Sequence, residues 1–244
     1  MADLPSRRER ARAGTLRDIR LAARRVLVEH GVEGLALRAI AREVGLTPPA
    51  LYRYFASREE LVEQVVADLY DELCDLMEAA RDAVDAATPG TRLLVTSRAF
   101  RTWAVTHPAE FGLLFGSAAD GVVPESADGE GPAAVAGRRF GEVFATLFVA
   151  VYLHRPFPVP ADGDLAADYL DQLRSWCADL PVRMPPGVMS VFLSCWVRLY
   201  GLVCMEVFGH LRFALADAGP LFEAEMRALG ERLGVVDEWV PPAA

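Results

Sequence analysis

The stretch LALRAIAREVGLTPPALYRYFASREE, residues 35–60, has the pattern of two short helices joined by a tight turn. Gly45 can adopt the positive φ that ends the first helix. Thr47 offers an N-cap hydroxyl for the second helix, and Pro48 suits its first position, where no amide donor is needed. One face of the first helix is apolar, because these residues recur at helical spacing: Leu37, Ile40, Ala41 and Val44.

The second helix has an apolar side and an exposed tip. Leu51 and Phe55 lie one turn apart and are expected to face inward, whereas Tyr52 and Arg53 point outward with the two prolines. Residues 57–60 form a capping box that starts a third helix. Two helices, a tight turn and an aromatic, basic tip predict a helix-turn-helix, the geometry that fits a helix into the major groove of DNA.

Residues 13–73 carry a wider pattern that includes this motif. In order, its positions are Ile19, Ala22-Ala23, Gly31, Ile40-Ala41, Gly45, Leu51-Tyr52, Tyr54-Phe55 and Arg58-Glu59-x-Leu61. The pattern resembles the N-terminal domain of the tetracycline-repressor (TetR) family, with the helix-turn-helix at residues 36–55. One position departs from the family, which usually has Ser or Thr where Ala36 stands here. Losing that cap costs about 0.5–2 kcal/mol locally, so we expect this helix start to fray.

The resemblance implies a set of DNA contacts. Tyr52, Tyr54 and Arg58 match family positions that contact phosphates, which position the duplex without reading it. Arg38 matches a position that reaches a base or a phosphate. Arg53 projects near the middle of the recognition helix and is our candidate for a bidentate contact to guanine. Four residues form the leading tip: Thr47, Pro48, Pro49 and Ala50. The last three lack a side-chain donor, so they would read thymine methyl groups or DNA shape.

The charge of the chain is unevenly distributed. The net charge of −9 argues against a nucleic-acid partner. Residues 1–60, however, hold twelve arginines against eight acidic residues, a balance of +4, whereas residues 61–244 hold thirteen arginines against twenty-six acidic residues, a balance of −13. A basic N-terminal part attracts phosphate. The alternative for each arginine is a solvated surface charge, and Tyr52 could instead be core packing.

The rest of the chain predicts an all-α fold, with a flexible basic arm before the DNA-binding domain and a helical bundle after it. Residues 1–12 lack apolar periodicity, and Arg7, Arg8, Arg10 and Arg12 would follow DNA or form a solvated tail. Residues 74–244 are expected to bind an effector and to dimerise. We expect a disordered acidic loop over 118–132. Helices are predicted over 16–30, 61–87, 91–106, 109–116, 133–154, 164–179, 187–213 and 220–233.

The segment 188–208 is long and apolar enough to span a membrane. Arg198 at its centre costs about 2.5–3.5 kcal/mol on insertion scales, and Glu206 adds to this, so we favour a helix buried on two sides. In the TetR family the last two long helices pair with those of a second subunit. The resemblance therefore implies a homodimer through residues 188–213 and 220–233. The spacing of Trp196 and Tyr200-Gly201 is also similar to a subgroup with a C-terminal Trp and His-Gly, although Tyr200 replaces the histidine.

Aromatic residues of the C-terminal part are candidates for an effector pocket. Such residues on helices are usually core, but pockets are also mostly apolar with a few polar anchors, and the resemblance implies a small apolar effector in this domain. The candidate polar anchors are His107, Arg198 and Glu206, and the last two are equally explained by an ion pair or an interface contact. The pocket candidates are Phe100, Trp103, His107, Phe111, Phe115, Phe144, Phe148, Trp176, Trp196 and Tyr200.

Other classes of function find little support in the sequence. The four cysteines and four histidines lack metal-site spacing, and no catalytic motif appears, so we expect no enzyme, metal or cofactor. No secretory leader opens the chain, which favours a cytoplasmic protein. We predict a repressor that a small apolar ligand releases from a palindromic operator in double-stranded DNA. The alternatives are a helical protein that binds small molecules without functional DNA binding, and an interaction-only scaffold.

Overall fold

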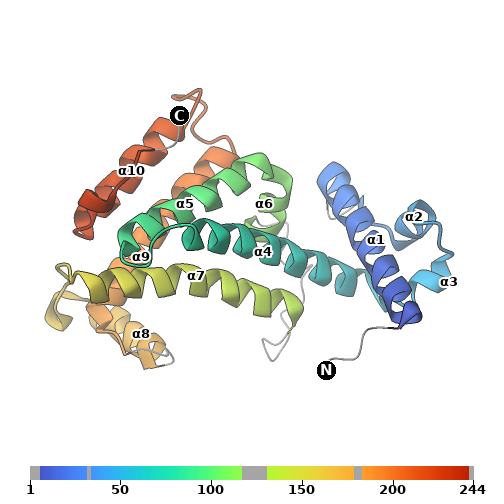
Figure 1. Ribbon diagram of the computed structural model, residues 1–244, viewed down its shortest axis with the longest axis horizontal. Helices are drawn as coiled ribbons and strands as arrows, with labels where there is room; N and C mark the ends of the chain where they lie inside the picture. The colour runs from blue at the N-terminus through green and yellow to red at the C-terminus, as the bar shows by residue number, and fades with distance from the viewer. Residues whose placement is uncertain (1–5, 32–33, 117–130, 179–182, 242–244) are drawn as a thin grey trace. The chain divides into compact units, whose positions relative to one another are not determined.

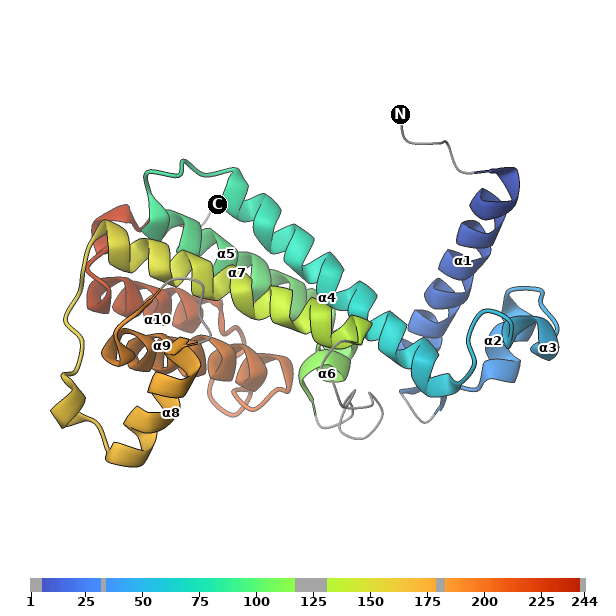
Figure 2. The same cartoon turned by 90° about the horizontal axis from the view of Figure 1, so that it is seen from below.

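The computed structural model describes residues 6–31, 34–116, 131–178 and 183–241. Within these ranges the chain is helical and contains no strand, which confirms the all-α prediction. The expected acidic loop lies mostly outside the described residues, because only residues 131 and 132 of it are described. The path of the chain can be followed in Figures 1 and 2.

The chain forms two compact units. The first, which we call the head, comprises residues 1–74 and 107–140, and the second, the body, comprises residues 75–106 and 141–244. Residues 107–140 group with the head, and an aromatic cluster of Tyr70, Phe115 and Phe140 contributes to this grouping, with ring centroids 5.3–5.9 Å apart. The division into a DNA-binding domain over 13–73 and an effector-binding and dimerisation domain over 74–244 stays a prediction.

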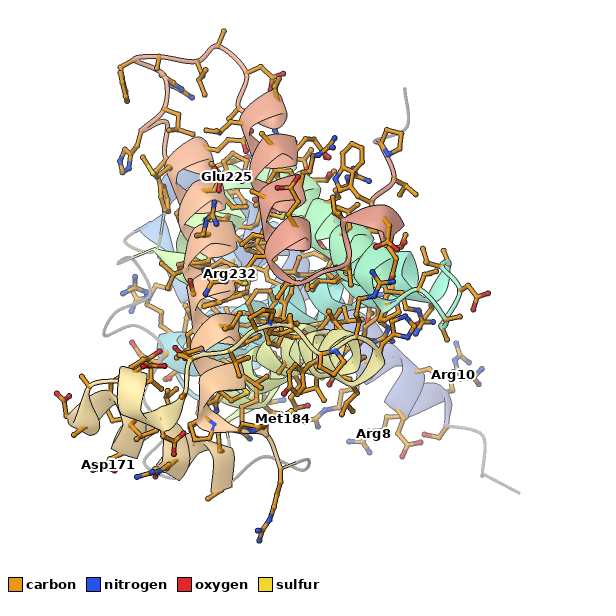
Figure 3. The ribbon with its side chains drawn as sticks, turned by 90° about the vertical axis from the view of Figure 1, so that its left-hand side faces the viewer. Arg8, Arg10, Asp171, Met184, Glu225 and Arg232 are labelled. Carbon is orange, nitrogen blue, oxygen red and sulfur yellow. The ribbon has the colours of Figure 1, made fainter. Side chains whose placement is uncertain are left out.

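The first helix of the head, α1, spans Arg7–His30 and therefore begins earlier than the sequence led us to expect. Ser6 and Glu9 form a capping box, in which the Ser6 Oγ accepts from the Glu9 amide and the Glu9 carboxylate accepts from the Ser6 amide. Such a reciprocal cap stabilises a helix start that apolar periodicity does not reveal. The predicted flexible arm is thus helical from Arg7, and Figure 3 shows Arg8 and Arg10 on the first turns of α1.

The helix-turn-helix consists of α2, Leu37–Glu43, and α3, Pro48–Leu51. Gly45 has a φ of 71°, as the sequence predicted, and Leu51 and Phe55 are buried. Ala36 provides no side-chain cap, in agreement with its departure from the family. Thr47 provides none either, contrary to expectation; only its carbonyl oxygen is engaged, by the amides of Ala50 and Leu51. The head is completed by the first part of α4, Arg58–Asp82, by α6, Pro108–Phe115, and by the start of α7, Pro132–His154.

The body is a bundle built around α9, Pro186–Val207. This helix contacts α5, Pro89–Thr106, α8, Ala167–Ala178, and α10, Gly219–Arg232. Two short 3-10 helices, η3 over Asp162–Asp164 and η4 over Val236–Glu238, lie in the connections. In Figure 3, α9 and α10 run side by side.

The helix α9 ends at Val207, six residues short of the predicted end at 213. The break comes at Gly209, whose φ of 74° is a conformation that ends helices readily. By length and composition α9 could cross a membrane, which is weak evidence because core helices of soluble proteins pass the same test. Its N-terminal half is packed in the body core, where Val188, Met189 and Val191 are almost completely buried.

Candidate nucleic-acid interface and apolar cavity

The tip of the head presents polar and basic groups to solvent. Arg38, Thr47, Pro49, Tyr52 and Arg53 are exposed, with 52% of Tyr52 accessible. The remaining predicted DNA contacts, Pro48, Ala50, Tyr54 and Arg58, are half-buried. The short α3 explains this exposure, since its two anchors Leu51 and Phe55 take one side of the segment into the core and leave the other side free.

The arginines of the head fall into two groups. Arg20 is paired with Asp68 at 3.1 Å, Arg24 bridges Glu72 and Glu110, and Arg25 is paired with Glu43 at 2.6 Å. These arginines tie α1 to α4, α6 and α2. The pKa of Arg24 is raised further, chiefly by its hydrogen bonds to Glu72.

The arginines at the tip differ from these. Among the residues that the structure describes, Arg38 and Arg53 have no ion-pair partner. Arg12 lies 5.6 Å from the ring of Tyr54, so the first helix reaches one of the predicted DNA contacts. An exposed guanidinium without an internal carboxylate keeps its five donors for phosphate or base edges. Arg38 and Arg53 therefore make positive charge available for DNA at the helix-turn-helix.

The body contains an apolar cavity with a volume of about 70 Å³. It lies among α5, α7, α9, α10 and the segment that follows α10, and none of the described residues that line it is charged. Of the predicted pocket residues, Phe144, Phe148 and Trp196 line it. Phe192, Cys195 and Trp239 also line it and were missed. Trp239 lies beyond the last predicted helix, where no periodic pattern indicates burial.

The other predicted pocket residues lie elsewhere. Phe100 is fully buried, 5.9 Å from Phe144 and 6.4 Å from Trp196 between ring centroids, so it forms the layer next to the cavity. Tyr200 stacks on Trp196 at 5.5 Å, and Trp176 packs on Phe192 at 5.8 Å. Trp103 is buried in the body without lining the cavity. The remaining three, His107, Phe111 and Phe115, belong to the head.

The two charged residues of α9 that the sequence left ambiguous have partners inside the body. Glu206 accepts two hydrogen bonds from Arg101, at 2.6 and 2.7 Å, and Arg198 pairs with Glu225 of α10. Neither residue lines the cavity. Figure 3 shows Glu225 on the side of α10 where α9 runs beside it. The cavity therefore has no ionic anchor, and among the described residues no group of three or more His, Cys, Asp or Glu side chains could hold a metal ion.

The outer face of α9 is partly apolar and solvent-exposed. Val197 is 66% exposed and Met205 is 42% exposed, and Phe208 and Phe213 follow in the segment after the helix. A Cβ added at Gly201 would meet no atom within 4 Å, so the chain itself leaves this face of α9 open. Exposed apolar residues gathered on one face commonly mark an interaction surface.

Together, a helix-turn-helix with unpaired arginines and a helical body with an apolar cavity define the class of helix-turn-helix regulators. Comparison with known proteins leads to the same class. Residues 19–65 match the family described as bacterial regulatory proteins, tetR family, and residues 93–229 match the tetracyclin repressor-like C-terminal domain. The chain belongs to the TetR family. It is a DNA-binding transcriptional regulator and not an enzyme.

Similar proteins cover most of the chain. The HTH-type transcriptional regulators Mb1846 of Mycobacterium bovis and Rv1816 of Mycobacterium tuberculosis are each 36% identical to it over 216 residues, which is 84% of this chain and 86% of theirs. The crystal structure of SCO4313 superimposes with a TM-score of 0.64 at 29% identity and covers 93% of this chain and 98% of that one. RolR in complex with resorcinol has a TM-score of 0.54 at 14% identity, covers 96% of this chain and 99% of its own, and supports the fold alone.

Proposed function

We propose that the protein is a cytoplasmic homodimeric repressor that binds a palindromic operator and leaves it when a small apolar ligand enters the body. A two-fold dimer presents two recognition helices, so the half-sites should lie about one helical turn or more apart. The observation that carries the DNA-binding half is the exposure of Arg38 and Arg53 at the helix-turn-helix, where neither has an ion-pair partner among the described residues.

The proposed DNA contacts divide by chemistry. Arg53 makes a bidentate contact to guanine, while Tyr52, Tyr54 and Arg58 bind phosphates and fix the register of the head on the duplex. Arg38 reaches a base or a phosphate. The apolar tip, with the hydroxyl of Thr47, approaches the base edges and reads thymine methyl groups or groove shape.

The proposed dimer forms through residues 188–213 and 220–233. The exposed Val197 and Met205 supply apolar contact area, and the open position Gly201 permits close approach of a second helix. Covering this face also removes an apolar surface that would otherwise favour aggregation.

The proposed ligand acts by binding one arrangement of the dimer better than another. A ligand shifts an equilibrium only by its unequal affinity for the two states. The apolar cavity supports this part of the proposal, because its walls are helices α5, α7, α9 and α10, two of which also form the proposed dimer face.

A direct test uses a duplex selected from a random library by the purified protein. Mobility shifts with the selected duplex and with a scrambled duplex, over a series of salt concentrations, should show tighter binding to the selected one and a linear fall of log affinity with log salt. Equal, weak binding to both duplexes at every salt concentration would favour the alternative function, a ligand-binding helical protein without functional DNA binding.

A further inference from the structure

The segment that follows α10 is fixed to the N-terminus of α5. We call residues 234–240 the strap. The Oε2 atom of Glu238 accepts a hydrogen bond from the Gly90 amide at 2.8 Å, and the Glu238 carbonyl oxygen accepts from the Thr91 hydroxyl at 2.7 Å. A Cβ added at Gly90 would stand 2.7 Å from Val235, so this close packing needs a glycine at residue 90. Glu238 thus attaches the strap to the first turn of α5, where the helix dipole also favours a carboxylate.

The second oxygen of the Glu238 carboxylate lacks a hydrogen-bond donor. The side chain of Glu238 is only 9% exposed, and its Oε1 atom is buried without a partner among the residues that the structure describes. A carboxylate oxygen that has lost its water is costly unless a donor or a cation replaces that water. The Nε2 atom of His154, the last residue of α7, lies 3.8 Å from this oxygen. The imidazole is therefore within ion-pair distance of the unpaired oxygen.

A neighbouring ion pair holds the strap at a second point and keeps its charges near neutral pH. Arg155 donates to Asp237 at 2.6 Å and to the carbonyl oxygen of Gly234 at 2.5 Å. The hydrogen bonds between the two side chains lower the pKa of Asp237 and raise the pKa of Arg155. These two charges offset each other, and Glu238 is left as a negative charge that faces His154.

Arginines surround the far end of the strap. Arg98 of α5 is paired with Glu223 at 2.6 Å and lies, together with Arg227, beside the Trp239 ring. Arginine stays protonated in proteins, and carboxylates of ordinary pKa are ionised near neutral pH. Among the described residues that hold the strap, His154 is therefore the one whose residue type changes its charge between pH 5 and pH 8.

We propose that His154 and Glu238 form a proton-sensitive latch, in which protonation of the imidazole gives the buried Glu238 oxygen an ionic partner and tightens the strap on α5. Only the imidazolium attracts the carboxylate, so the attachment is stronger below the pH range in which histidine titrates and weakens as the pH rises through it. The strap contributes Val235 and Trp239 to the lining of the cavity, so the latch sets how firmly one wall of the body is held. The inference concerns the body alone and does not depend on the proposed repressor function.

The test follows hydrogen exchange of the Gly90 and Thr91 amides in the full-length protein, because both donate to the Glu238 carboxylate. Protection factors, corrected for the intrinsic pH dependence of exchange, are measured between pH 8 and pH 5.5. His154→Gln removes the titrating group. Glu238→Gln keeps an acceptor oxygen for the amides but removes its charge. The matched control is His30→Gln, since His30 is an exposed histidine of the head that also lies beside a glutamate.

In the wild type, the protection of both amides should rise about 2- to 5-fold between pH 8 and pH 5.5, the effect of one partly exposed ion pair. The rise should persist in His30→Gln and disappear in both His154→Gln and Glu238→Gln. A flat profile in the wild type or an unchanged rise in His154→Gln would overturn the inference. An unchanged rise in Glu238→Gln would also overturn it, because the imidazole would then act through Asp237. Circular dichroism at each pH confirms that the variants are folded.

Discussion

The tip of the head and the body use their arginines in opposite ways. At the tip of the head, Arg38 and Arg53 are exposed and have no ion-pair partner among the described residues. In the body, Arg98 and Arg101 each make two hydrogen bonds to one carboxylate, of Glu223 and Glu206. The net charge of −9 therefore says little about function. The distribution of the unneutralised positive charges matters more, and Arg38 and Arg53 place two of them at the helix-turn-helix.

The largest expected effect comes from separating the proposed dimer. Gly201→Arg places a long charged side chain on the open face of α9, which the chain itself tolerates because no atom lies within 4 Å of the new Cβ. We expect a monomer by light scattering and a loss of operator affinity of about 100-fold or more, since two linked heads bind with far greater avidity than one.

The matched control for this variant is Gly141→Arg. Gly141 is an exposed helical glycine that, like Gly201, has no atom within 4 Å of an added Cβ. It should remain dimeric and bind operator normally. A dimeric Gly201→Arg protein with wild-type affinity would place the interface elsewhere. It would also contradict the claim that this face of α9 determines operator affinity.

Within the head, substitutions of single arginines should distinguish a contact that reads a base from a contact that positions the duplex. Arg53→Ala is expected to cost about 1–3 kcal/mol of operator affinity and to relax one base position, whereas Arg58→Ala should weaken binding to every sequence alike. Fluorescence anisotropy with matched and scrambled duplexes distinguishes the two. Arg25→Ala is the control, because it removes the same charge from an arginine already paired with Glu43. Identical losses for all three variants would mean that the tip acts only through its net charge.

Removing an arginine from the body should affect stability and not sequence preference. The side chains of Arg101 and Glu206 are only 20% and 14% exposed, so Arg101→Ala leaves a largely buried carboxylate unpaired and also loses the contact with the Phe222 ring. We expect the free energy of unfolding, measured by urea denaturation, to fall by about 1–3 kcal/mol. A variant of full stability that had lost operator preference would contradict the division between the two units.

The last effect concerns the cavity wall and appears only at high pH. Burial raises the pKa of the Cys195 thiol to about 11 from an ordinary value of 9.0. Because the unfolded chain ionises first, this thiol stabilises the fold fully below about pH 9, and the contribution is lost as the pH rises toward 11. The stability difference between wild type and Cys195→Ala should therefore shrink by about 2 kcal/mol between pH 8 and pH 11. A difference independent of pH would mean that Cys195 is solvated.

Much of the head could be predicted because its determinants are local. The positive φ of Gly45 and the buried Leu51 and Phe55 follow from residue type and spacing alone. The start of α1 could not be found from apolar periodicity, since its first turns are exposed on all sides and begin at a polar capping box.

The body was less predictable because its features depend on contacts between distant segments. The helices themselves follow from periodicity, but Trp239 lines the cavity in a segment after α10 that is held by hydrogen bonds from Gly90 and Thr91 of α5, far away in the sequence. Likewise, no local pattern indicates that Glu206 pairs with Arg101 or that Arg198 pairs with Glu225.

The most direct measurement is the mass and salt dependence of the complex between the wild-type protein and its selected operator, by analytical ultracentrifugation and anisotropy. Two chains per duplex are predicted, with log affinity falling linearly with log salt and a slope reduced by about one for Arg58→Ala. A monomer that binds no duplex at low ionic strength would contradict a dimer that reads DNA through Arg38 and Arg53 of its heads.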